Sequence, residues 1–294
     1  MTRTYLTTRQ SLRDGLPLRL YQKAKRFGVW DPAALDFSRD RDDWLRLTDV
    51  QREALLQLTS LFQAGEESVT LDLLPLIQVI AAEGRLEEEL FLTSFLWEEG
   101  KHTEFFRRVL DEICVETGDL SHFHSPSYRR LFSEELPAAM GALVDDPSPA
   151  AQARAVVTYT MIVEGVLAET GYYSYFETLE QNDLMPGLRE GVGKLKQDES
   201  RHIAYGVYLL ARLLAEDPSL WDGVVARMNE LLPLALGVVE ESLDPFDEPP
   251  FGIPPEAFIE YATSQFGKRY ARLERARTQT LAQVETEESL GSDA

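Results

Sequence analysis

The feature that most constrains the fold is a pattern of glutamate and histidine residues that occurs twice in the chain. In each half, a segment with helical periodicity and a glutamate among apolar residues precedes a second segment with Glu-x-x-His. Residues three apart lie on one face of a helix, so a carboxylate and an imidazole can reach one ion from a single helix. Two such helices and two further glutamate-bearing helices form a two-metal site inside a four-helix bundle. The candidate ligands are Glu66, Glu99 and His102 in the first half, and Glu164, Glu199 and His202 in the second.

The spacing of the two copies supports a common arrangement. The interval from Glu66 to His102 is 36 residues, and that from Glu164 to His202 is 38. A single Glu-x-x-His in an acidic chain is often a surface ion pair. Here the chain has only 4 histidines, two of them in this motif, and all four glutamates have apolar helical neighbours such as Phe62 beside Glu66. Because a buried carboxylate is costly unless it is paired or metal-bound, the pattern favours a metal site, and its oxygen and imidazole ligands suit iron or manganese.

Neighbouring acids could replace the candidate ligand at three positions. Glu67 follows Glu66 but has polar neighbours, which favours Glu66. Glu98 could reach His102 at a spacing of four residues, and Glu169 lies on the same predicted helix as Glu164. The repeated pattern favours Glu66, Glu99 and Glu164 over these three.

Two further groups of polar residues need an interpretation. Asp198 directly precedes Glu199 and could accept a hydrogen bond from the outer ring nitrogen of a ligating histidine, which we expect to be His102. A surface charge is an equally good interpretation of Asp198. His122 and His124 lie in a connection that contains serine and proline, and we interpret them as solvated loop residues.

Apolar periodicity predicts an all-α protein without β-strands. We expect residues 1–276 to form one metal-binding domain, with a basic lead-in segment over residues 1–27 and irregular structure over residues 31–44. The last 18 residues, 277–294, are polar and acidic and are predicted to be a disordered tail. Helices are predicted at about 48–82 with a capping box at Thr48 and Gln51 and a kink near Pro75, and at about 86–114, 150–180, 188–211, 220–243 and 255–276.

Composition limits the classes of partner. The formal charge of −21 disfavours binding to nucleic acid and to anionic membranes. No apolar stretch approaches the roughly 20 residues that a membrane-spanning helix needs. The single cysteine, Cys114, excludes an intramolecular disulfide and fits a reducing cytoplasm, where we expect the protein to act.

The motifs resemble those of the ribonucleotide reductase small-subunit superfamily, and most closely those of its ligand-binding oxidases. The resemblance extends from about residue 25 to residue 276. It implies a ferritin-like four-helix bundle core with additional helices, a manganese/iron or di-iron cofactor, and a homodimer. It also implies dioxygen as a reactant and a long-chain fatty acid in an apolar tunnel, with its carboxylate on the metals. The matching segments are residues 25–32 (KRFGVWDP), 36–40 (DFSRD), 65–70 (GEESVT), 97–102 (WEEGKH) and 198–202 (DESRH).

The same resemblance implies a covalent bond between two side chains. In these oxidases a valine three residues after the first ligand glutamate is joined through its Cβ to a tyrosine oxygen, and the matching residues are Val69 and Tyr159. Both could instead be ordinary core residues. Two departures argue against a working reductase subunit: Phe106 stands where conventional subunits have the radical tyrosine, and no tyrosine or tryptophan follows Arg277. The oxidase is therefore favoured.

Three other functions compete with an oxidase. A ribonucleotide reductase small subunit is one, and an acyl-carrier-protein desaturase with similar Glu-x-x-His motifs is another. The acidic carrier of a desaturase needs a basic docking face, which a chain of this charge supplies poorly. A metal store or ligand-binding sensor would use the same ligands without turnover. The physiological substrate and the electron donor are not identified by the sequence.

Overall fold

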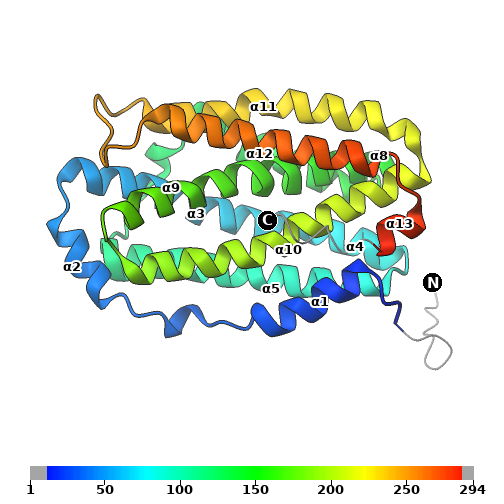
Figure 1. Ribbon diagram of the computed structural model, residues 1–294, viewed down its shortest axis with the longest axis horizontal. Helices are drawn as coiled ribbons and strands as arrows, with labels where there is room; N and C mark the ends of the chain where they lie inside the picture. Colours follow the sequence, from blue (N-terminus) through cyan, green and yellow to red (C-terminus); the bar gives the residue numbers. More distant parts are fainter. Residues whose placement is uncertain (1–11, 287–294) are drawn as a thin grey trace.

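The computed structural model describes residues 12–286, and in this part of the chain every regular element is helical. The long helices run roughly along the long axis of the molecule, side by side (Figure 1). The predicted all-α class is therefore confirmed. The α-helices are α1 (Leu16–Phe27), α2 (Ser38–Arg46), α3 (Asp49–Asp72), α4 (Leu74–Ala82), α5 (Leu86–Arg108), α6 (Pro126–Arg130), α7 (Leu136–Gly141), α8 (Pro149–Val156), α9 (Glu169–Gln181), α10 (Pro186–Glu216), α11 (Trp221–Leu243), α12 (Pro255–Ala276) and α13 (Leu281–Thr286).

Shorter helical segments of other types connect or continue these helices. The 3-10 segments are η1 (Pro32–Ala34), η3 (Ser121–Phe123), η5 (Ala142–Val144) and η7 (Pro218–Leu220). The π-helical segments are η2 (Val109–Cys114), η4 (Leu131–Glu135) and η6 (Val157–Ala168).

Four elements carry the candidate ligands: α3, α5, η6 and α10. The first of them begins at the predicted capping box, in which the Gln51 backbone N–H donates to the Thr48 hydroxyl and the Thr48 N–H donates to the Gln51 side chain. It ends at Asp72, and Pro75 lies in the first turn of α4, so the predicted interruption near Pro75 is confirmed. Helices α3 and α5 pack together, as do η6 and α10, while α11 and α12 cover η6.

The helix predicted over residues 150–180 is interrupted by the π-helical segment η6. In a π-helix the hydrogen bonds join residues five apart, so Tyr159 and Glu164 lie on one side of η6, and both are buried. The Gly165 carbonyl accepts a hydrogen bond of 3.2 Å from Nε of Arg269, on α12. A Cβ at Gly165 would lie 2.9 Å from the Thr160 carbonyl oxygen and 3.0 Å from Arg269 Nε, so glycine fits this close approach.

The segment over residues 31–44 differs from the predicted irregular structure because it contains most of α2. Two aspartates on α2 are buried although they are charged, and the reason lies on another helix. Asp40 accepts hydrogen bonds from the backbone N–H groups of Gly187 and Leu188, and Asp43 accepts one from Met185. These are free N–H groups at the start of α10, where carboxylates are favoured by the helix dipole. The buried aspartates of α2 therefore act as hydrogen-bond acceptors for the free backbone N–H groups at the start of α10.

The two ends of the described chain also differ from the prediction. The basic lead-in segment contains α1, whose Leu16, Leu20 and Ala24 are buried, and α1 packs on α5 and α10. The predicted disordered tail contains α13, and Val284 of α13 is fully buried in the core against α10. The few apolar residues of this short helix, in a polar and acidic segment, were too weak a pattern to predict this contact. The remainder of the tail, residues 287–294, lies outside the described residues, as do residues 1–11. Within the described chain, no helix is long and apolar enough to cross a membrane.

Candidate metal centre

The structure brings all six candidate ligands together in the middle of the bundle. They form two overlapping groups, in each of which one ligand atom per residue lies within 4.8 Å of the others. Glu99 and Glu199 belong to both groups, so their carboxylates are placed to bridge two ions. All six side chains are buried, with exposed fractions of 0–5%. One group is Glu66, Glu99, His102 and Glu199, and the other is Glu99, Glu164, Glu199 and His202.

Both histidines turn the same ring nitrogen toward this cluster. Nδ1 of His102 lies 3.3 Å from Glu199 Oε1, and Nδ1 of His202 lies 3.2 Å from Glu99 Oε1. Buried polar atoms are rarely left without a hydrogen-bond partner, because desolvation then goes uncompensated. Seven such atoms occur here: Nδ1 of both histidines, both carboxylate oxygens of Glu99 and of Glu164, and Oε2 of Glu199. Cations are the partners that this set of oxygen and nitrogen donors lacks.

Asp198 lies beside the outer nitrogen of His102, as the sequence predicts. Its Oδ2 is 3.3 Å from His102 Nε2. The same carboxylate accepts hydrogen bonds from Trp30 Nε1 at 2.8 Å and from Lys101 Nζ at 2.9 Å, and it also pairs with Arg201. A donor bond from Nε2 leaves the lone pair of Nδ1 for a metal ion, which is the tautomer that a ligating histidine needs.

Glu98 has the equivalent role for His202, which the sequence pattern did not predict. Glu98 Oε2 lies 2.9 Å from His202 Nε2, and Glu98 Oε1 accepts a hydrogen bond of 2.6 Å from Arg201. The helical spacing along α5 indicates only that Glu98 could rival Glu99 as a ligand beside His102. The signal for its actual role is the repeated acid before each ligand glutamate, Glu98 before Glu99 and Asp198 before Glu199.

Glu67, Glu169 and the two loop histidines lie away from the cluster. Glu67 is exposed, as predicted, and Glu169 is buried beside Tyr261 and Lys196. His122 and His124 lie in and directly after the 3-10 segment η3, where His122 is exposed and His124 contacts Ser60. None of these four residues belongs to either ligand group.

Burial and neighbouring groups perturb the protonation of Glu66, Glu99 and Glu164. Burial raises the pKa of Glu66 to about 8 and holds the pKa of Glu164 well above its usual range, with the Glu199 charge adding to the effect on Glu164. Burial also opposes ionisation of Glu99, but hydrogen bonds from both histidines outweigh it and lower its pKa to about 2. Two divalent cations would neutralise the four carboxylates in place of protons. The residues therefore fit a dinuclear metal site.

The predicted partners Val69 and Tyr159 lie next to each other beside the cluster. Val69 is one helical turn after Glu66, and the Tyr159 hydroxyl donates to the Val69 carbonyl at 3.4 Å. Both are buried, at 5% and 1% exposure. The phenol of Tyr159 therefore lies against the backbone of Val69.

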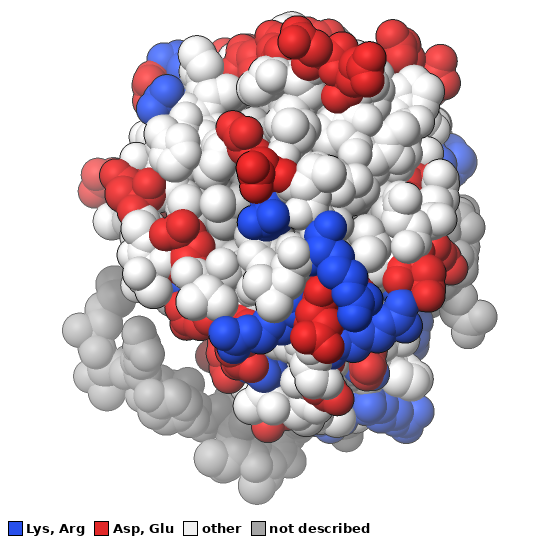
Figure 2. Space-filling view, turned by 90° about the vertical axis from the view of Figure 1, so that its left-hand side faces the viewer, with Lys and Arg blue, Asp and Glu red and all other residues white. Residues whose placement is uncertain are grey.

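A cavity of about 210 Å³ reaches from the carboxylates to the connection between α11 and α12. Its inner end is lined by Glu66, Glu99, Glu164 and Glu199, and its outer end by Pro249 and other residues of the connection. Figure 2 views the molecule from the end that carries α2 and this connection, and uncharged surface separates acidic groups at the top from a band of basic groups below. Most of the lining between the two ends is apolar, including Leu58, Phe62, Phe132, Leu167 and Val239.

Comparison with known proteins places this geometry in a family. The family model for the ribonucleotide reductase small chain matches residues 18–261. The chain belongs to this family. Among solved structures, a valine-to-isoleucine variant of an R2-like ligand-binding oxidase with an anaerobically reconstituted Mn/Fe cofactor is 41% identical, with a TM-score of 0.83 over 87% of this chain and 92% of that chain. A tyrosine-to-phenylalanine variant with an aerobically reconstituted Mn/Fe cofactor gives the same values.

A third solved structure agrees with these two. It is a glycine-to-phenylalanine variant of an R2-like ligand-binding oxidase with an aerobically reconstituted Mn/Fe cofactor, 40% identical, with a TM-score of 0.84 over 87% of this chain and 96% of that chain. The family, the ferritin-like helical fold and the class of metal-dependent oxidoreductase expected from the sequence are thereby confirmed.

Proposed function

We propose that the protein is a ligand-binding oxidase that activates dioxygen at a manganese/iron pair, or at two irons, held by the six residues of the cluster. The observation that carries this proposal is the set of seven buried, unpartnered donor atoms, which all belong to the ligand groups. Glu99 and Glu199, which belong to both ligand groups, would be shared by the two ions, and His102 and His202 would each hold one through Nδ1. When bound, the metal pair supplies the oxidising power to remove hydrogen from an aliphatic C–H bond.

The cavity beside the carboxylates is the proposed substrate pocket. Its apolar walls suit an acyl chain, and its inner end suits a carboxylate only when metal ions offset the charge of Glu66 and Glu164. We therefore propose a long-chain fatty acid, with its carboxylate on the metals and its chain directed toward Pro249. The similarity to R2-like ligand-binding oxidases supports a bound ligand in this cavity.

The Val69–Tyr159 pair is proposed to form an ether bond. Val69 loses the hydrogen on Cβ, Tyr159 loses its hydroxyl hydrogen, and a Cβ–O bond replaces both. The bond releases two electrons and two protons, which the metal pair held by the six ligands would accept, with dioxygen as the final oxidant. Burial of both residues beside the cluster, and the 3.4 Å bond from the phenol to the Val69 backbone, support the close approach that the step needs.

Aerobic loading of the metal-free protein with manganese and iron tests the proposal. Intact-mass and peptide-mapping analysis should find the loss of two hydrogen atoms and a peptide that contains both Val69 and Tyr159. The Tyr159→Phe variant is the control, since it keeps the ring and removes the oxygen. An unchanged mass would refute the crosslink, while elemental analysis of the same sample distinguishes a manganese/iron pair from two irons.

Oxygen uptake separates this oxidase from a non-enzymatic metal protein. A metal store or sensor would bind ions in fixed stoichiometry without consuming dioxygen.

A reductase subunit is disfavoured by Phe106, which is fully buried and stacks on Phe62 at 4.8 Å without a phenol oxygen. A desaturase would consume dioxygen and produce a double bond in a carrier-bound acyl chain. A cytoplasmic location and a homodimer stay predictions.

A further inference from the structure

A buried tyrosine–carboxylate pair lies outside the metal cluster and has no part in the chemistry described so far. The Tyr205 hydroxyl donates a hydrogen bond of 2.9 Å to Glu88 Oε2. Tyr205 is on α10, one turn after His202, and Glu88 is in the first turn of α5. Their exposed fractions are 1% and 3%. A phenol and a carboxylate are thus held together away from water.

Two arginines, which also pair with Glu83 and Glu216, contact the Glu88 carboxylate. Arg212, which is 1% exposed, lies further along α10 and places Nε 3.3 Å from Glu88 Oε1. Arg85 Nη1 lies 3.8 Å from the same oxygen. Burial outweighs these contacts and raises the pKa of Glu88, which makes its carboxylate a stronger proton acceptor toward a phenol that loses an electron.

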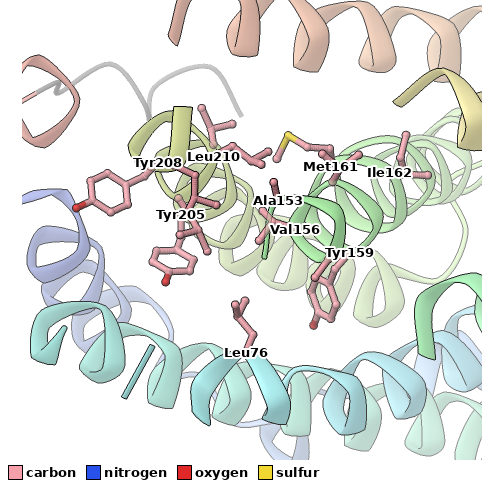
Figure 3. Close-up of a cluster of buried hydrophobic side chains, with 14 of the residues drawn as sticks. Leu76, Ala153, Val156, Tyr159, Met161, Ile162, Tyr205, Tyr208 and Leu210 are labelled. Carbon is pink, nitrogen blue, oxygen red and sulfur yellow. The ribbon is translucent and has the colours of Figure 1, made fainter. Parts of the chain in front are cut away.

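Aromatic rings connect this pair to the metal cluster. The ring of His202 stacks on Phe95 with centroids 3.6 Å apart, Phe95 and Phe91 are 6.0 Å apart, and Phe91 and Tyr205 are 5.1 Å apart. The backbone offers a second connection, because three residues of α-helix rise only about 4.5 Å. Figure 3 shows Tyr159 and Tyr205 on different helices of the same core, with Leu76 of α4 near both.

We propose that Tyr205 is a redox-active tyrosine that gives one electron to the oxidised metal pair and its hydroxyl proton to Glu88. The metal pair is reduced by one electron, Glu88 becomes a neutral acid, and a neutral tyrosyl radical remains on Tyr205. This inference rests on the proposed oxidase function, which supplies the oxidant. Electron transfer from Tyr205 would draw oxidising equivalents away from the metal-ligating side chains when no C–H bond is available for reaction.

Of the other buried tyrosines, Tyr172 donates at 3.4 Å to Glu199, a carboxylate already assigned to the metal ions, whereas Tyr175 and Tyr128 contact neutral oxygens. The Tyr175 hydroxyl is 2.9 Å from the Thr59 hydroxyl, and the Tyr128 hydroxyl donates to the Leu61 carbonyl at 2.8 Å. Neither acceptor is a base that can keep the proton of an oxidised phenol. Tyr175 is fully buried, like Tyr205, and therefore serves as the matched control.

The test uses the full chain with Tyr159→Phe, in which the proposed crosslink cannot consume the oxidant. This parent and two double variants, adding Tyr205→Phe or Tyr175→Phe, are loaded with metal, mixed with dioxygen and freeze-quenched for electron paramagnetic resonance. We expect a tyrosyl radical signal in the parent, its loss with Tyr205→Phe, and its retention with Tyr175→Phe. Glu88→Gln should weaken the signal because the phenol then lacks a base. If Glu88→Gln does not fold, the result with Tyr205→Phe alone decides the question.

Oxygen uptake and metal content are measured on the same samples. A radical signal that survives Tyr205→Phe, or no signal in a parent that consumes dioxygen, would overturn the inference and leave the oxidase intact. Absence of oxygen uptake in the metal-loaded wild-type protein would overturn both.

Discussion

The outer partners of the two histidines provide the sharpest test of the metal centre, because each contacts only one of them. Glu98→Gln and Asp198→Asn remove a negative charge while keeping the size of the side chain. Loss of such a partner typically weakens metal binding by about 10–100-fold. This range corresponds to about 1.4–2.8 kcal/mol, similar to one hydrogen bond to a charged group.

The structure indicates which variant has the larger effect. The Glu98–His202 bond is 2.9 Å long and the Asp198–His102 bond is 3.3 Å. Asp198 also divides its charge among Trp30, Lys101 and Arg201, whereas Glu98 bonds to Arg201 in addition to its histidine. We therefore expect Glu98→Gln to weaken binding of the ion at His202 by about 100-fold, and Asp198→Asn to weaken binding of the ion at His102 by about 10-fold.

Oxygen-free titration of the metal-free variants with manganese and iron measures the two affinities separately. Glu67→Gln makes the same change at an exposed acid next to Glu66 and should leave both affinities unaltered. Thermal unfolding of the metal-free variants identifies any general loss of stability, because Asp198→Asn also leaves Lys101 without its carboxylate partner. The expected order would be contradicted if either variant lowered the affinity for both ions equally, or if Asp198→Asn had the larger effect.

Four more predictions concern the cluster and the helix that carries Gly165. Glu99→Ala should abolish binding of both ions, since both histidines face Glu99, and elemental analysis after desalting measures the loss. Metal affinity should fall as pH decreases below about 8, because the raised pKa of Glu66 means that a proton must leave before a metal ion binds. Metal titrations on either side of this pH test the predicted change in affinity. In the metal-free protein the same shift favours the folded state at low pH, and this contribution should disappear in unfolding experiments as pH rises from 4.5 to about 8. Gly165→Ala should cost about 1–3 kcal/mol of unfolding free energy through contact with Thr160 and Arg269, while Gly100→Ala, with nothing within 4 Å of the added Cβ, is the control.

The sequence predicted the cluster well because its information is local to each helix. A spacing of three residues fixes the relative placement of Glu99 and His102, and of Glu199 and His202, whatever else the chain does. The partner of an outer nitrogen is not local: Glu98 on α5 bonds to His202 on α10, so the spacing along α5 pointed to the wrong histidine.

The missed helices have the same explanation. Asp40 makes α2 resemble an irregular acidic segment, yet its partners are backbone N–H groups almost 150 residues later in the chain. Within η6 the Gly165 carbonyl accepts a hydrogen bond from Arg269 on α12, and no periodicity within residues 150–180 indicates that contact. Contacts between distant segments decided each of these features, and they overrode local composition.

Two concentric layers of charge explain how so many ionisable groups can occupy one core. The outer layer contains two acids, Glu98 and Asp198, and two bases, Lys101 and Arg201, and its side chains are 0–6% exposed. This layer is neutral by itself. The inner layer of four glutamates is neutral only with two divalent ions or with added protons, and the raised pKa values of Glu66 and Glu164 reflect that need. Because the outer layer is already balanced, it can hold the Nε2 side of both histidines before metal arrives. The surrounding carboxylates outweigh burial and hold the pKa of both rings well above its usual range, so metal binding replaces a proton on each Nδ1 without rebuilding the surrounding network.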